Sequence, residues 1–75
     1  MNYKIEFYQL TPCGNRFYIR AHNVCKKGQV DKSIELGKWF SKEHLRTNDK
    51  LLVYIKNKQG EILDKYTFEK QEIKD

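Results

Sequence analysis

The sequence predicts a small, mainly β domain, on the border of the α+β class, with about five short antiparallel strands. Apolar and polar side chains alternate strictly over residues 16–22, which is typical of a strand with one buried and one solvated face. The same alternation occurs over residues 3–10 and residues 51–58. Stretches that contain Pro, Gly or Asn separate these segments, and such residues favour tight turns.

The first two strands, residues 3–10 and residues 16–22, are expected to form a β-hairpin. The intervening residues 11–15 include Pro, Gly and Asn, which supply turn chemistry. A turn centred on Cys13 pairs Tyr8 with Tyr18, Glu6 with Arg20, and Lys4 with His22. In this register residues 16–22 form an interior strand, and the buried side chains are Ile5, Phe7, Phe17 and Ile19.

Residues 30–36 have two possible interpretations. Val30, Ile34 and Leu36 alternate with polar residues, which favours a third strand. The alternative is a helix from about Lys32 to Leu45, in which Gly37 would cost about 1 kcal/mol relative to alanine. We interpret the segment as a strand. A short helix capped by Ser41 then follows it.

The last two strands are expected at residues 51–58 and 61–70, joined by a tight turn that ends in Gly60. The final strand would bury Ile62, Tyr66 and Phe68, and residues 71–75 would form a frayed tail. Five strands with a helix between the third and the fourth would curl into a small barrel or half-barrel, the element order of OB-type barrels. If residues 30–36 are helical, the single domain is instead a four-stranded antiparallel sheet with one helix, in the order ββαββ.

Length and charge limit the function classes. A chain of 75 residues has too little core to enclose a deep substrate cleft, so we expect a binding domain, neither an enzyme nor a cofactor carrier. The formal net charge is +5, and nearly all of the excess lies in residues 1–30, which indicates an anionic partner. No apolar run has the length of a signal peptide or membrane span, so a cytoplasmic location without membrane contact is expected.

The outward side chains of the first two strands form the predicted binding surface. Flat aromatic rings between cations suit single-stranded nucleic acid, because bases stack on the rings and cations follow the phosphates. The predicted site residues are Tyr8, Arg16, Tyr18, Arg20, His22, Lys26, Lys27, Tyr54, Lys56 and Lys58. The simpler alternative is an ordinary solvated sheet face, in which Glu6 pairs with Arg20 across the hairpin.

Two further hypotheses follow from the aromatic residues and the strands. Trp39 and Phe40 would anchor a protein partner if they are exposed, as in a small inhibitor or adaptor of the kind that mobile genetic elements or phages encode. An unpaired edge strand would support a homodimer.

A metal site is not expected. The candidate ligands are Cys13, His22, Cys25 and His44, but only His22 and Cys25 have a short spacing, and on a strand they point to opposite faces. Cys13 and Cys25 lie at opposite ends of the second strand, on the order of 25–30 Å apart at about 3.3 Å per residue. We therefore predict two free thiols, with no nucleophile–base pair that the spacing would identify.

Overall fold

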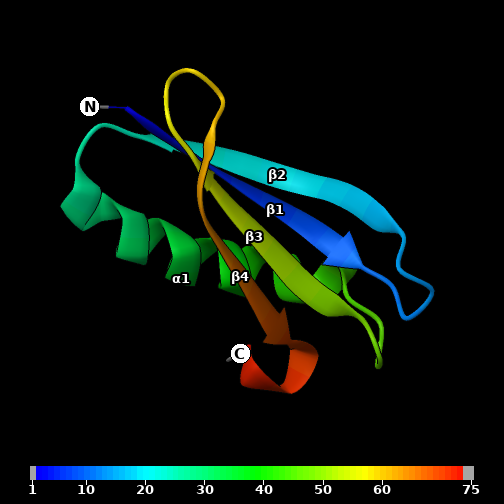
Figure 1. The fold of residues 1–75 in the computed structure, drawn as a ribbon. Coiled ribbons are helices and arrows are strands. Elements are labelled where there is room, and N and C mark those ends of the chain that lie inside the picture. Colours follow the sequence, from blue (N-terminus) through cyan, green and yellow to red (C-terminus); the bar gives the residue numbers. More distant parts are fainter. Residues whose placement is uncertain (1, 74–75) are drawn as a thin grey trace.

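The computed structural model describes residues 2–73 and contains a four-stranded antiparallel sheet with one helix packed across one face (Figure 1). The elements are β1 (Tyr3–Leu10), β2 (Arg16–Val24), α1 (Val30–Ser41), β3 (Lys50–Lys56) and β4 (Ile62–Glu69). Short 3₁₀ helices η1 (Lys27–Gln29), η2 (Lys42–His44) and η3 (Lys70–Glu72) flank α1 and follow β4. The ββαββ alternative is thus confirmed. The five-stranded barrel is wrong, because the sheet is open and has the order β2-β1-β3-β4.

Helix α1 forms where a third strand was expected. Its buried residues Val30, Ile34, Gly37 and Ser41 follow the spacing of one helical face. Leu36 is half exposed, so it belongs to the opposite face, and counting it as core produced the false alternation. Gly37 is required by packing, since a Cβ at this position would lie under 3.0 Å from ring atoms of Phe7. Helix α1 continues through Gly37 and ends at Ser41. Ser41 is also the N-cap residue of the short 3₁₀ helix η2, but its side chain makes no capping hydrogen bond.

The hairpin of β1 and β2 has the expected pair Tyr8 and Tyr18, but the two strands change register between Phe7 and Tyr8. Phe7 pairs with Arg20, so Ile19 is an extra residue, a β-bulge, that has no partner on β1. Beyond the bulge the pairs are Glu6 with Ala21 and Lys4 with Asn23, which corrects the expected partners Arg20 and His22. Strand β2 is also an edge of the sheet and not an interior strand.

The core lies between α1 and the sheet face that α1 covers. Its buried members are Ile5, Phe7, Val30, Ile34, Leu45, Leu51, Val53, Ile55 and Ile73. The expected burial of Ile5 and Phe7 is confirmed, and Ile19 packs against this cluster while remaining partly exposed. The prediction that Phe17 is a core residue is wrong, because Phe17 lies on the edge strand near the turn and is 53% exposed.

Strand β4 and the segment after it also differ from expectation. Ile62 and Tyr66 are exposed because β4 is the other edge of the sheet, whereas Phe68 packs against the core. The expected frayed tail is wrong for residues 71–73, since η3 continues β4 and Ile73 is buried. The remaining two tail residues, 74 and 75, lie outside the described residues.

Candidate nucleic-acid interface

The sheet has a second face, which α1 does not cover, and we call it the open face (Figure 1). Residues that pair across antiparallel strands point to the same side, and successive residues alternate, so the register assigns each side chain to a face. The open face carries Lys4, Glu6, Tyr8, Leu10, Arg16, Tyr18, Ala21, Asn23, Lys50, Leu52, Tyr54, Lys56, Ile62, Lys65, Thr67 and Glu69.

Of the predicted site residues, Tyr8, Arg16, Tyr18, Tyr54 and Lys56 lie together on the open face. They come from β1, β2 and β3, which are adjacent in the sheet. The expectation that they share one side with Arg20 and His22 is wrong, because the bulge at Ile19 reverses the alternation within β2.

Arg20 and His22 lie on the helix side. The guanidinium carbon of Arg20 is 4.4 Å from the ring centroid of Phe40 on α1, a cation–π contact. The His22 ring meets the Phe7 ring at a centroid distance of 5.2 Å. Burial, and then the charge of Arg20, lower the pKa of His22 below its usual 6.5, against a hydrogen bond to the backbone of Ser33. His22 is therefore a neutral packing residue at pH 7.

Lys26, Lys27 and Lys58 lie in connections at the end of the sheet where β1 begins. Lys26 is the N-cap residue of η1, and Lys27 is in η1 and lines a hollow on the helix side. Lys58 is in the turn between β3 and β4, where the backbone N–H of Gly60 donates to the Asn57 carbonyl. These lysines flank the open face and do not form part of it.

A row of tyrosines from three strands forms the centre of the open face. The Tyr8 ring lies 5.8 Å from Tyr18 and 5.6 Å from Tyr54 between centroids, in edge-on arrangements. Nη1 of Arg16 donates to the Tyr54 hydroxyl at 2.8 Å, so the guanidinium and this buried ring hold each other in place. Tyr18 is 62% exposed and presents its ring to solvent.

Glu6 is a buried carboxylate in the same face. It accepts a hydrogen bond from the Tyr8 hydroxyl at 3.0 Å, and its oxygens lie 2.9 Å from the Lys56 ammonium and 3.6 Å from that of Lys4. Burial by itself would raise the pKa of Glu6. The hydrogen bonds from Lys56 and Tyr8 and the charges of both lysines outweigh burial, so the pKa lies below its usual 4.5. Glu6 is therefore ionised at neutral pH and orders Tyr8 and Lys56.

We expect Glu6→Gln to lower the free energy of unfolding at pH 7 by about 1.5–3 kcal/mol, since hydrogen bonds to a charged group are lost. The folded-state pKa of Glu6 is depressed, so its contribution is present above the unfolded value near 4.5 and disappears as the pH falls through the folded value. Urea unfolding between pH 7 and pH 3 should show a shallower acid-dependent loss in the variant. Glu61→Gln, an exposed carboxylate in a turn, should change stability by less than about 0.5 kcal/mol. If Glu6→Gln lost as much unfolding free energy between pH 7 and pH 3 as the unmodified protein, the loss would come from other carboxyl groups.

The open face carries five cations and two acids, so it holds three of the five excess positive charges of the chain. Its cations are Lys4, Arg16, Lys50, Lys56 and Lys65, and its acids are Glu6 and Glu69. In contrast, α1 and η2 carry Lys32, Lys38 and Lys42 against Asp31, Glu35 and Glu43. Lys4, Lys50 and Lys65 were not among the predicted site residues. The alternation of residues 3–10 would have identified Lys4, and the alternation of residues 65–68 would have identified Lys65. Lys50 lies one residue before the strand that was expected at residues 51–58.

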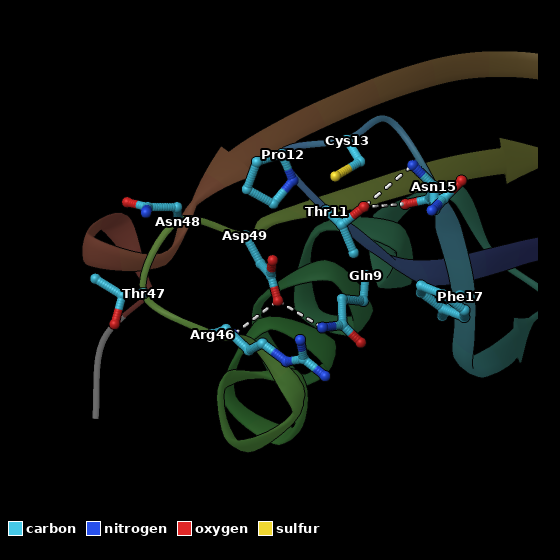
Figure 2. Close-up of a pocket in the computed structure, with 10 residues that line it drawn as sticks. All are labelled: Gln9, Thr11, Pro12, Cys13, Asn15, Phe17, Arg46, Thr47, Asn48 and Asp49. Carbon is cyan, nitrogen blue, oxygen red and sulfur yellow. Dashed lines mark hydrogen bonds between the residues drawn. The ribbon is translucent and has the colours of Figure 1, made fainter.

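A hollow of about 730 Å³ lies between the β1–β2 turn and the segment of residues 46–49 (Figure 2). Asp49 is buried there and accepts hydrogen bonds from the side chain of Gln9 and the backbone N–H of Arg46, so its carboxylate is already satisfied. The hydrogen bond from Arg46 is the main reason why the pKa of Asp49 is low. The described lining residues include the thiol of Cys13 but no histidine that would act as its base. The described lining therefore offers the Cys13 thiol no histidine base.

Cys13 and Cys25 are both exposed free thiols. Within residues 2–73 no three His, Cys, Asp or Glu side chains gather closely enough to hold a metal ion. No helix in this part of the chain has the length and apolar character that a membrane span needs.

Comparison of the chain with protein-family models, curated proteins and solved structures finds no match. The function is therefore inferred from the geometry and the charge of the open face alone.

Proposed function

We propose that the protein binds single-stranded nucleic acid on the open face of its sheet. One observation carries this proposal: the tyrosine row, which includes the exposed ring of Tyr18, and the unbalanced cations occupy the same face, which α1 leaves uncovered. A protein surface needs no such arrangement for solubility, for which scattered charges of both signs are enough.

Tyr18 supplies the exposed ring on which a base would stack, and the edge-on contact with Tyr8 limits its movement. Arg16 on the same strand and Lys65 on β4 lie on either side of the row and would contact phosphates. Stacking of this kind needs bases that are not already paired and stacked in a duplex, so single strands are favoured. Glu6 does not oppose the phosphates strongly, because it is buried and its charge is matched by two lysines.

Two arginines on β2 provide a matched test, since they lie four residues apart on opposite faces. Arg16→Ala should weaken binding of a labelled mixed-sequence oligonucleotide. The slope of log affinity against log salt concentration should become shallower by about 0.7, the value for one phosphate contact on a single strand. Tyr18→Ala should cost about 1–3 kcal/mol through lost stacking, with little change of the slope. Fluorescence anisotropy at several salt concentrations measures both quantities.

Arg20→Ala is the control, because Arg20 contacts Phe40 on the helix side. It should leave the affinity and the salt slope unchanged. Equal effects of the two arginine substitutions would contradict the assignment to the open face. No binding by the unmodified protein at low salt would reject nucleic acid as the ligand.

A further inference from the structure

Helix α1 has a second apolar surface, on the side that faces away from the core. Leu36 is 50% exposed and Trp39 is 49% exposed, although each is large and apolar. Lys32 and Glu43 extend the same line at its two ends and are also exposed. The spacing of four and three residues places Lys32, Leu36 and Trp39 in one stripe along α1, and η2, which continues α1 directly, carries Glu43 at the end of this stripe. We call Lys32, Leu36, Trp39 and Glu43 the outer stripe.

The outer stripe is complementary to a reversed copy of itself. If two α1 helices lie antiparallel with the midpoint between Gly37 and Lys38, Leu36 of one copy faces Trp39 of the other. The same rotation brings Lys32 of each copy to Glu43 of its partner. A two-fold contact requires this reciprocity, in which residue i meets residue j and j meets i. We infer that the outer stripe, on α1 and η2, is the contact surface between two copies of this chain.

The charges favour a second copy over a partner of one charge sign. The stripe is positive at Lys32 and negative at Glu43, so an acidic or a basic segment would be attracted at one end and repelled at the other. The sheet edges are less suitable for a dimer than α1. Both edge strands are interrupted by bulges, at Ile19 in β2 and at Leu63 in β4, and a bulge prevents a continuous ladder with another strand.

Trp39, one of the two apolar side chains at the centre of the stripe, already contacts its neighbours. The Trp39 ring meets the Phe40 ring edge-on at 4.8 Å between centroids, and the Lys42 ammonium is 5.7 Å from the centroid of Trp39. Ordering the Trp39 ring on contact therefore costs little entropy. The helix is short, about 18 Å for its 12 residues at about 1.5 Å per residue, so the contact is smaller than a standard interface. The dimer is accordingly weak and reversible.

This contact is independent of the proposed nucleic-acid surface. Helix α1 and the open face lie on opposite sides of the sheet (Figure 1), so a dimer through α1 leaves both open faces accessible.

Charge reversal tests the contact by sedimentation equilibrium in the absence of nucleic acid. The unmodified protein should show a mass that rises toward the dimer with concentration. Lys32→Glu and Glu43→Lys should each weaken self-association about tenfold, because each creates two like-charge pairs. An equimolar mixture of the two variants should associate again, since every pair across the contact is then of opposite sign. The double variant, Lys32→Glu with Glu43→Lys, should also self-associate.

Both positions are exposed, so the variants should keep the circular dichroism spectrum of the unmodified protein. Glu61→Lys, a charge reversal in the β3–β4 turn, is the control and should not alter the association. Trp39 is the one tryptophan of the chain, so its emission should shift to the blue as the dimer forms. A monomer at every concentration would overturn the inference. So would an associating protein in which mixing the two variants restores nothing, or one whose dimer persists in Leu36→Glu.

Discussion

Phe7→Ala should lower the free energy of unfolding by about 3–5 kcal/mol, the usual cost of removing a buried aromatic ring. Phe7 is fully buried in the middle of β1, between Gly37 of α1 and the ring of His22. A domain of this length has a total stability of about 4–11 kcal/mol at about 0.05–0.15 kcal/mol per residue, so the variant should be largely unfolded on mild heating. Urea unfolding and thermal melts followed by circular dichroism measure the loss.

Phe17→Ala is the matched control, because it makes the same chemical change in the same hairpin at a side chain that is 53% exposed. Phe17→Ala should change the free energy of unfolding by no more than about 0.5 kcal/mol. Equal losses in the two variants would mean that Phe17 belongs to the core, as the alternation of residues 16–22 had suggested.

Gly37→Ala is expected to destabilise the protein by about 1–2 kcal/mol. A methyl group at this position would lie under 3.0 Å from the ring of Phe7, and overpacking of this kind costs about 1–3 kcal/mol. Alanine gains about 1 kcal/mol over glycine in helix propensity, which offsets only part of that cost. The melting temperature should fall by about 4–8 °C for each kcal/mol lost in a domain of this size.

Gly28→Ala is the control for this substitution, since a Cβ at Gly28 meets nothing within 4 Å. Gly28→Ala should leave the free energy of unfolding almost unchanged. Phe7→Leu combined with Gly37→Ala should cost less than the sum of the two single changes, because the smaller side chain leaves room for the methyl group. A Gly37→Ala protein that is more stable than the unmodified one would show that α1 can move away from the sheet without loss.

Local sequence signals predicted both hairpins. The turn residues and the alternation of residues 3–10 and 51–58 are local, and the pair Tyr8 and Tyr18 follows from them. Gly60 has φ of +87°, as the tight turn requires. The helix was ambiguous because Gly37 lowers helix propensity, while its benefit, the close approach to Phe7, is a contact between distant parts of the chain.

The candidate site was predictable up to the bulge in β2. Tyr8, Tyr18 and Arg16 precede it in the hairpin and share the face that alternation assigns to them. Arg20 and His22 follow it, and nothing in the residue types around Ile19 marks an extra residue, since this bulge contains no glycine. The second bulge, at Leu63, changes only the side of Ile62, whereas the alternation that buries Phe68 also places Lys65 on the open face, so Lys65 was predictable from the sequence.

Because of the bulge at Ile19, β2 contains one residue more than its pairing with β1 requires. If Ala21 were deleted, Ile19 could take the position opposite Phe7, and every pair before Tyr18 and after His22 would keep its partner. The only charged side chain to change sides would be Arg20, which would move from Phe40 to the open face. A shorter chain would thus carry a larger basic surface. In this strand the number of residues, as well as their identity, determines which side of the protein is charged.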